Sequence, residues 1–257
     1  MSVDLNADVG EGMDDATILP YVTSANVACG MHAGSPTIMN ETAELAISRG
    51  IRVGAHPGYP DRANFGRKSV EMSAGEIENL VVFQVAALEG FVRSRGARLS
   101  HVKPHGALYH DGGEFPDVAR SIAEGVRRVG PHLVLVGAAG SMLIGAGREA
   151  GLTVAEEAFA DRRYQADGTL VPRSEEGALV TDPDEAAEQA VRLAHERIVI
   201  ANDGSRIAVR ADTICLHGDT PGAAEIARRI HERFQLAGIR IAPLDAASLS
   251  RGDLEAP

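Results

Sequence analysis

The sequence contains few cysteines, no basic N-terminal segment and no long apolar run. Cys29 and Cys215 are the only cysteines among 257 residues, which excludes a disulfide framework. The first 30 residues include five acidic residues and no basic one, unlike a signal peptide. Charged residues interrupt every apolar stretch before it reaches the roughly 20 residues that a membrane span needs. We therefore expect a soluble, reduced protein of the cytoplasm.

Positive charge is also scarce. The chain has 25 Lys and Arg residues against 36 Asp and Glu residues, so its formal net charge is −11. Nucleic acids and anionic membrane surfaces attract clustered positive charge, so we expect neither as a partner. The segment Gly66-Arg67-Lys68-Ser69 lacks the glycine spacing of a phosphate-binding P-loop and is typical of a basic surface loop. Since no repeat, low-complexity tract or linker interrupts the chain, we expect a single domain over residues 1–257.

Short runs rich in Val, Ile and Leu alternate with segments of helical periodicity. The expected strands are residues 3–6, 25–28, 51–54, 99–103, 133–136, 152–155 and 213–216. Expected helices begin at Ser35-Pro36 and at the capping box of Ser73 and Glu76, and cover 115–129, 141–150, 184–197 and 222–237. Asp182-Pro183 and Thr220-Pro221 are expected to start the last two of these helices. Residues 197–200 and 206–209 flank an Asp-Gly turn and predict a β-hairpin.

A strand–helix alternation repeated about seven times predicts a parallel sheet of the α/β class. An open doubly wound sheet would need a glycine-rich phosphate turn after its first strand, where this chain places Asp8 and Glu11. We therefore favour a single distorted β/α barrel of the TIM-like type, with about seven parallel strands and a small hairpin insertion before the last one.

Polar side chains gather at the ends of six of the seven expected strands. They are Asn6, Asp8 and Glu11; Cys29 and His32; His56, Tyr59 and Asp61; Lys103, His105 and Tyr109; Glu157, Asp161 and Arg162; and His217 and Asp219. A lone His or Asp at a strand end usually caps a helix or satisfies a loop. Six such ends on the rim where barrels carry their active sites are hard to explain as capping. The pattern predicts a catalytic or binding rim.

Two chemistries fit this set of residues. Asp8, His32 and His56 could bind zinc or a similar ion. Alternatively, acids and imidazoles could transfer protons while Lys103 and Arg162 hold a substrate carboxylate or a developing phosphate charge. Lys103 could also act as a Schiff-base nucleophile, and the sequence does not choose between these roles. For the two cysteines we expect buried thiols rather than a zinc site.

Six motifs carry a resemblance to a known family. They are residues 4–11 (DLNADVGE), 25–34 (ANVACGMHAG), 54–61 (GAHPGYPD), 102–109 (VKPHGALY), 159–162 (FADR) and 215–219 (CLHGD). Together and in this order they resemble the LamB/YcsF family. The resemblance implies a distorted β/α barrel related to polysaccharide deacetylases. It also implies one subunit of an ATP-dependent 5-oxoprolinase, which opens the lactam of 5-oxo-L-proline to L-glutamate while ATP becomes ADP and phosphate.

The resemblance further implies 5-oxoproline and ATP (with Mg²⁺) as ligands, the subunits PxpB and PxpC as partners, and no tightly bound metal. The catalytic residues that we expect are Asp8, His32, His56, Lys103, His105, Glu157 and His217. The substrate-binding residues that we expect are Asn6, Tyr59, Tyr109, Asp161, Arg162 and Asp219. If a metal is present, Asp8, His32 and His56 are its expected ligands.

One position departs from the family pattern, because Ser35 stands where the family usually has Asp. Both residues cap helices well, so the helix should form, whereas any chemical role of that Asp is in doubt here. Two alternatives remain open. One is a stand-alone, metal-dependent amide or carbohydrate deacetylase, and the other is a non-catalytic subunit that binds a ligand and docks on partners.

Overall fold

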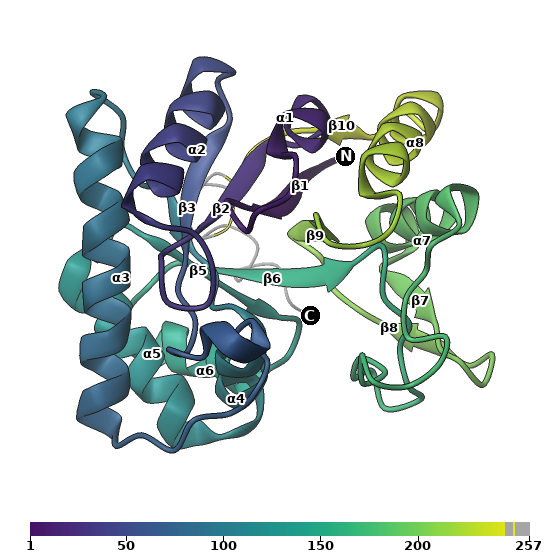
Figure 1. Cartoon of the computed structure of the whole chain (residues 1–257). Coiled ribbons are helices and arrows are strands. Elements are labelled where there is room, and N and C mark those ends of the chain that lie inside the picture. Colours follow the sequence, from purple (N-terminus) through teal and green to yellow (C-terminus); the bar gives the residue numbers. More distant parts are fainter. Residues whose placement is uncertain (245–248, 250–257) are drawn as a thin grey trace.

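Seven parallel strands close into a barrel in this computed structural model, which describes residues 1–244 and residue 249 (Figure 1). The strands are β1 (Ser2–Val9), β2 (Ser24–Ala28), β3 (Arg52–His56), β4 (His101–Val102), β5 (Val134–Ala138), β6 (Val154–Phe159) and β9 (Thr213–His217). Each strand pairs with the next in this order, and β9 pairs back with β1. The predicted β/α barrel is therefore confirmed. The single domain predicted for 1–257 stays a prediction, and residues 245–248 and 250–257 lie outside the described residues.

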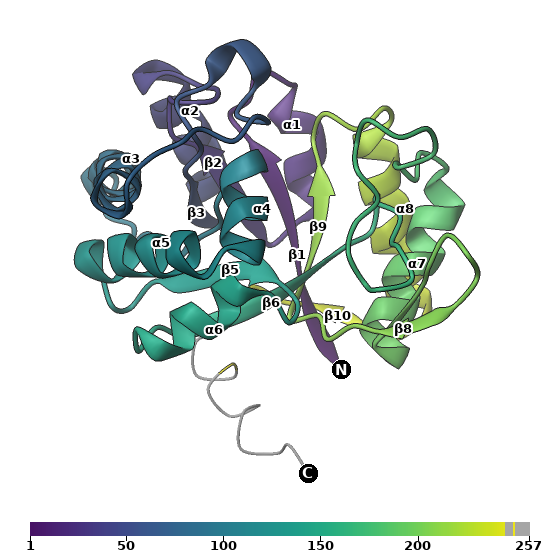
Figure 2. The same cartoon turned by 90° about the horizontal axis from the view of Figure 1, so that it is seen from below.

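Helices surround the barrel on its outside. They are α1 (Asp15–Ile18), α2 (Pro36–Ser48), α3 (Ala74–Ser94), α4 (Gly106–Glu114), α5 (Pro116–Val129), α6 (Met142–Glu149), α7 (Pro183–Glu196) and α8 (Ala223–Leu236). Seen from below, α3, α5 and α6 lie on one side of the strands and α7 and α8 on the other (Figure 2). The predicted hairpin is confirmed as the antiparallel pair β7 (Ile198–Ile200) and β8 (Arg206–Ala208).

Two elements were not predicted from the sequence, apart from short helical turns. One is β10 (Arg240–Ile241), which pairs with the start of β1 outside the closed ring. The other is α4, whose sequence contains three glycines among nine residues and therefore has weak helix propensity. Helix α4 matters for the site because it carries Tyr109 and His110.

The helix starts follow the predicted caps with one exception. The Ser35 hydroxyl accepts the backbone N–H of Ile38, so the residue that replaces the family's Asp does cap α2. Ser73 and Glu76 form the predicted capping box of α3. Thr220, in contrast, does not cap α8: Gly222 is the N-cap, and the Thr220 hydroxyl donates to Asp161 Oδ2 at 2.6 Å. Thr220 therefore holds Asp161 in place and does not cap α8.

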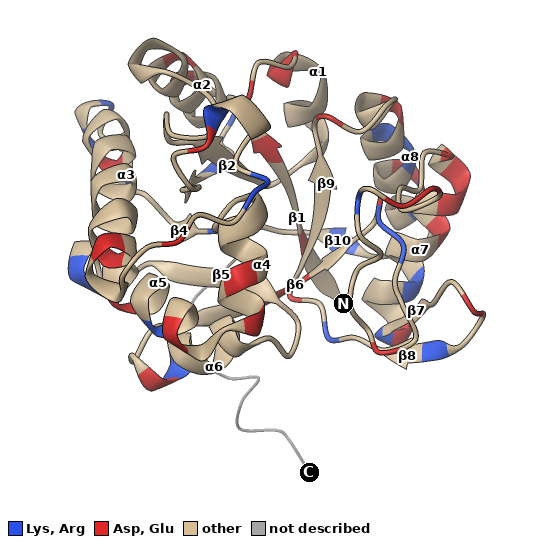
Figure 3. Cartoon of the chain, turned by 60° about the horizontal axis from the view of Figure 1, so that its bottom comes forward, with Lys and Arg blue, Asp and Glu red and all other residues tan. Residues whose placement is uncertain are grey.

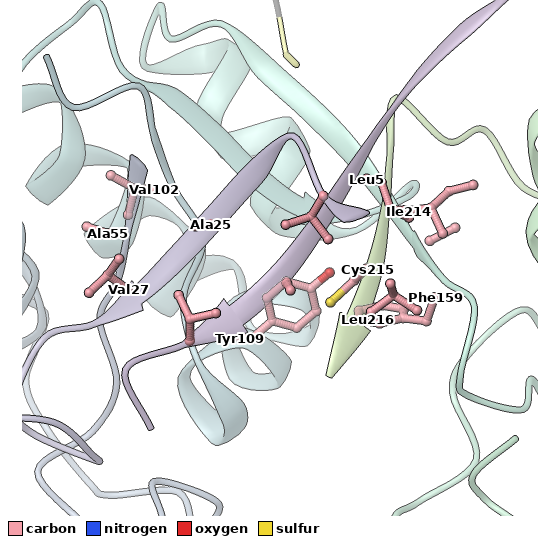
Figure 4. Close-up of a cluster of buried hydrophobic side chains, with 14 of the residues drawn as sticks. Leu5, Ala25, Val27, Ala55, Val102, Tyr109, Phe159, Ile214, Cys215 and Leu216 are labelled. Carbon is pink, nitrogen blue, oxygen red and sulfur yellow. The ribbon is translucent and has the colours of Figure 1, made fainter. Parts of the chain in front are cut away.

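Strand β1 separates apolar residues from polar ones by its alternation. Leu5, Ala7 and Val9 are fully buried in the apolar core, part of which Figure 4 shows around Leu5, Val27 and Ile214. The intervening Asp4, Asn6 and Asp8 make their contacts across the barrel. The polar residues of β1 therefore do not follow the strand, as the sequence suggested, but lie within it and face the barrel interior.

Most charged residues lie on the outer helices and loops, while acidic residues also occur on β1 itself (Figure 3). None of the described helices is both long enough and apolar enough to cross a membrane.

Candidate active site

Lys103 lies at the centre of the barrel's carboxyl end. Its ammonium donates to Asp8 Oδ1 on β1 at 2.9 Å, and lies 3.0 Å from Glu157 Oε1 on β6 and 2.9 Å from Cys215 Sγ on β9. Burial opposes this charge, but the nearby Asp8, Cys215 and Glu157 raise the pKa of Lys103 well above its usual value. A protonated amine cannot attack a carbonyl, so these neighbours favour a cation over a Schiff-base nucleophile.

Glu11 connects the three histidines beside this cation. The loop after β1 places its Oε1 atom 3.1 Å from His32 Nε2, 3.2 Å from His105 Nδ1 and 3.8 Å from His56 Nε2. The rings of His32 and His105 stack with centroids 3.7 Å apart, and His105 Nδ1 lies 3.0 Å from His56 Nε2. Three strand ends thus deliver their imidazoles to one carboxylate.

The charge states of these groups follow from burial and from their neighbours. Burial lowers the pKa of His32 to about 4 and also lowers that of His105. Burial would lower the pKa of His56 as well, but the adjacent Asp8 carboxylate raises it above its usual value. Burial disfavours ionised Asp8, yet His56 and Lys103 hold its pKa well below the usual range. Similarly, the contacts with His105 and His32 outweigh burial and lower the pKa of Glu11.

A second imidazole is oriented at the end of β9. His217 Nδ1 donates to Asp161 Oδ1 at 2.9 Å, and Asp161 Oδ2 accepts the His217 backbone N–H at 3.1 Å and the Thr220 hydroxyl. The partners of Asp161, led by the His217 charge, overcome its burial and lower its pKa to about 2. With Nδ1 held by the carboxylate, His217 Nε2 carries the free lone pair of the neutral ring, as in a general base.

Three arginines, Arg67, Arg162 and Arg173, also line the pocket. Arg67 pairs with Asp219, which also accepts from Arg173 at 3.4 Å. Arg162 donates from Nη2 to the carbonyl of Val171, while its buried Nε has no hydrogen-bond partner among the described residues. Burial, reinforced by Arg173, lowers the pKa of Arg162 to about 10. The segment around Arg67 is therefore not simply a solvated basic loop, because Arg67 forms part of the pocket wall.

These groups surround a small cavity of about 40 Å³. Eight of the predicted site residues line it: Asp8, His56, Lys103, His105, Tyr109, Arg162, His217 and Asp219. Three more touch the lining residues from behind, namely His32 through Glu11, Glu157 through Lys103 and Asp161 through His217. The predicted rim thus converges on one pocket.

The structure places two predicted substrate-binding residues away from this cavity. Asn6 lies deeper in the barrel, where its amide donates to Glu157 Oε1 and to the Thr213 hydroxyl. Tyr59 donates its hydroxyl to Asp111 at 2.9 Å. Both residues therefore hold other side chains in place and do not line the pocket. Tyr109 does line it, and donates to Glu157 Oε2 at 2.8 Å.

Sequence reasoning assigned no catalytic or binding role to Glu11, Arg67 or Arg173, although all three line the cavity. The position of Glu11, soon after the first strand, could have indicated that it belongs to the site. No sequence feature indicated Arg67 or Arg173, because both lie in long loops far from any strand end. Both cysteines are buried free thiols, and burial raises the pKa of Cys29 to about 12.

The closed ring of parallel strands and its buried polar site place the chain in the class of β/α-barrel proteins with a site at the carboxyl ends of the strands. Comparison with known proteins then identifies the family. The chain belongs to the LamB/YcsF family, whose sequence profile matches residues 3–249.

Curated relatives cover nearly the whole chain. The A subunit of 5-oxoprolinase from Methylococcus capsulatus is 50% identical over 249 residues, which are 95% of this chain and 96% of that protein. The protein of the same name from Streptomyces avermitilis is 49% identical, over 93% of this chain and 98% of that protein. The crystal structure of a lactam utilization protein from Thermus thermophilus superposes with a TM-score of 0.90 at 44% identity, covering 95% of this chain and all of that one.

Proposed function

We propose that this chain is the A subunit of an ATP-dependent 5-oxoprolinase, which opens the lactam of 5-oxo-L-proline to L-glutamate while ATP becomes ADP and phosphate. The near-complete match to relatives that bear the name of the 5-oxoprolinase A subunit supports the substrate class. The word subunit in those names supports a complex, for which we propose PxpB and PxpC as the partners.

The observation that carries the proposal is the pairing of an oriented base with buried cations around one cavity. His217, with Nδ1 held by Asp161, lines the same cavity as Lys103 and Arg162. An amide hydrolase needs both, because water must lose a proton while negative charge develops on oxygen.

Arg162 is the anchor that we assign to the substrate carboxylate. Its guanidinium is buried and fixed by one backbone carbonyl, and its Nε–H has no partner among the described residues. A carboxylate bound there would satisfy that donor and gain a charge-assisted hydrogen bond. Lys103 cannot take this role easily, since Asp8, Glu157 and Cys215 already surround its ammonium.

ATP would activate the lactam, which is a poor electrophile. The lactam oxygen attacks the γ-phosphorus and ADP leaves. Water then adds to the activated carbon as His217 accepts a proton. His217 returns this proton to the ring nitrogen, which leaves as the amine. A second water hydrolyses the resulting acyl phosphate to glutamate and phosphate. Arg67 and Arg173, at the pocket wall, are the groups that we assign to the transferred phosphoryl charge and its Mg²⁺-bound donor.

The test is reconstitution of the three subunits, with glutamate and ADP measured together and each component omitted in turn. Asp161→Asn should lower kcat by about 10²–10⁴-fold, because an amide can donate to His217 Nδ1 and no longer fixes the ring's tautomer as the carboxylate does. The exposed His195→Asn is the matched control and should retain full turnover. Glutamate formation by the chain alone, without ATP, would instead support a stand-alone hydrolase. Unchanged turnover of Asp161→Asn and Lys103→Met complexes would support a non-catalytic binding subunit.

A further inference from the structure

The hydrogen bonds of His56 fix which of its nitrogens carries a proton. His56 Nδ1 lies 2.7 Å from the backbone carbonyl oxygen of Lys103. A carbonyl oxygen can only accept, so Nδ1 must be the N–H donor. In the neutral ring, His56 Nε2 therefore presents a lone pair.

His105 is fixed in the opposite sense. Its Nε2 lies 2.8 Å from the carbonyl oxygen of Phe65, so Nε2 carries the proton and Nδ1 presents a lone pair. The two lone-pair nitrogens, His56 Nε2 and His105 Nδ1, lie 3.0 Å apart. Two carboxylate oxygens close the group: Glu11 Oε1 is 3.2 Å from His105 Nδ1, and Asp8 Oδ2 is 3.4 Å from His56 Nε2. Four buried acceptors thus face one another.

With Asp8 and Glu11 ionised, no placement of protons on the two rings satisfies these contacts together. If the proton is on His56 Nε2, His105 Nδ1 and Glu11 Oε1 are two acceptors in contact with no proton between them. If the proton is instead on His105 Nδ1, His56 Nε2 and Asp8 Oδ2 are two acceptors in contact with no proton between them. Protons on both rings place two N–H groups head to head at 3.0 Å. A single multivalent cation would accept a lone pair from each of the four atoms, which removes the contacts between acceptors.

We propose that His56 Nε2, His105 Nδ1, Glu11 Oε1 and Asp8 Oδ2 bind one divalent transition-metal ion of the zinc class. Donors at about 2.0–2.2 Å from a zinc ion stand roughly 3.3 Å apart at tetrahedral angles. The adjacent donors that the structure brings together are 3.0–3.8 Å apart. Two imidazoles and two carboxylates suit zinc, iron or manganese better than magnesium or calcium, which prefer oxygen alone.

The surroundings of this four-donor site resemble the outer shell of a metal centre. Both ligand imidazoles donate their remote N–H to a backbone carbonyl, the arrangement that fixes the tautomer of metal-binding histidines. The carbonyl that holds His105 belongs to Phe65, which adopts a left-handed backbone conformation (φ 57°) that a non-glycine residue adopts at a cost. Asp8 uses its other oxygen, Oδ1, for Lys103 and Asn26, which leaves Oδ2 available to the metal.

His32 is a positioning residue in this arrangement and not a ligand. Its ring is parallel to that of His105, with centroids 3.7 Å apart, so the two rings cannot both point a lone pair at one ion. His32 instead donates Nε2–H to Glu11 and does not line the cavity, whereas all four proposed ligands do. The ligand set therefore differs from Asp8, His32 and His56, which the sequence suggested. It also departs from the expectation of no tightly bound metal.

Two groups of described residues place ligand atoms within 4.8 Å of one another: Glu11, His32, His56 and His105, and Asp8, Cys215 and His217. The second group does not compete for the ion. The Lys103 ammonium lies 2.9 Å from both Asp8 Oδ1 and Cys215 Sγ and already supplies the positive charge there. Because the four-donor site borders the cavity, a metal bound there would polarise a carbonyl or phosphoryl oxygen of the substrate.

Metal analysis of the purified full-length chain tests the site without any activity assay. We expect one zinc-class ion per chain, removable by a chelator and restored by Zn²⁺, with protons released on reloading if protonated ligands bind it. Co²⁺ in its place should give a tetrahedral ligand-field spectrum without a thiolate charge-transfer band. Glu11→Gln and His105→Asn should abolish stoichiometric Zn²⁺ binding. His32→Asn should keep the stoichiometry and weaken affinity by about 10–100-fold, the usual cost of an outer-shell change. The exposed His132→Asn is the matched control and should bind as the wild type does.

Wild-type protein that binds neither Zn²⁺ nor Co²⁺ after chelation and reloading would overturn the proposal. A thiolate band would also overturn it, because it would place the ion at Cys215. Circular dichroism separates loss of a ligand from loss of the fold. If both ligand variants are unfolded, the wild-type stoichiometry and cobalt spectrum still decide. Failure here leaves the oxoprolinase proposal standing, since that proposal is measured by glutamate and ADP formation.

Discussion

Replacing Lys103 by Met removes the cation that contacts both Asp8 and Glu157 inside the barrel. The lysine is 3% exposed, and its ammonium lies 2.9 Å and 3.0 Å from the two carboxylates. Methionine has a similar length and fills the same space, so the change removes charge with little change in volume.

The expected cost follows from these distances. At an effective dielectric constant of about 20, unit charges 3.0 Å apart interact by roughly 5–6 kcal/mol. Part of this energy offsets the desolvation of the lysine, which the variant no longer bears. Breaking a buried ion pair by removing one partner typically costs about 3–5 kcal/mol, and we expect Lys103→Met to fall in this range.

Urea unfolding followed by circular dichroism measures this cost. Lys68→Met is the matched control, because Lys68 is the chain's only other lysine and is exposed. It should change the free energy of unfolding by less than about 0.5 kcal/mol. Adding Glu157→Gln to Lys103→Met removes one of the unpaired carboxylates. The double variant should therefore recover about 1–3 kcal/mol relative to the sum of the two single changes.

The reasoning fails if Lys103→Met costs less than about 1 kcal/mol, or if the two changes add independently. Either result would mean that water or proton uptake compensates the carboxylates, and that the barrel does not hold Lys103 as a fixed cation.

Three further changes test separate features. Burial raises the pKa of Asp4 from 3.8 to about 6, so its contribution to stability is complete below about pH 4 and is lost as the pH rises through 6. In the wild type, the free energy of unfolding should decline by up to about 3 kcal/mol over this range, and Asp4→Asn should remove this decline. The urea midpoint of the variant should therefore change less with pH than that of the wild type. Arg162→Lys should raise KM for 5-oxoproline at least about 10-fold with a smaller effect on kcat, because lysine cannot reproduce the guanidinium fork; equal KM values would refute the anchor. Gly66→Ala should cost roughly 1–3 kcal/mol in thermal unfolding, because its Cβ would lie 2.7 Å from His32 Cβ at a φ of 65°; an unchanged Tm would contradict the packing around the histidines.

The barrel and the position of its rim could be predicted because both follow from local patterns. Seven short apolar runs alternating with helices permit few architectures, and parallel strands place all their carboxyl ends on one side. Residues directly after a strand, such as Lys103 and His105, were therefore brought together as expected.

Side-chain direction in loops could not be predicted in the same way. Glu11 and His32 both follow strands, yet Glu11 lines the cavity while His32 supports it from behind. Spacing along the chain does not tell which of two such residues points inward, because the loop's tertiary contacts decide it. The same limit applies to Thr220, whose sequence context predicts a helix cap but whose hydroxyl is taken by Asp161.

The interior of this barrel carries a column of polar groups where branched apolar side chains are usual. Asp4, Asn6 and Asp8 stand in succession along β1, and each accepts a hydrogen bond from a side chain of β2. Such a network adds little net stability, since desolvation consumes most of its electrostatic gain. The apolar residues that β1 turns toward the helices must therefore supply the stability of the strand. In return, the column fixes Asp8 and Lys103 before any ligand arrives. A site whose charges need no reorganisation on binding is better suited to stabilising a transition state than to merely retaining a ligand.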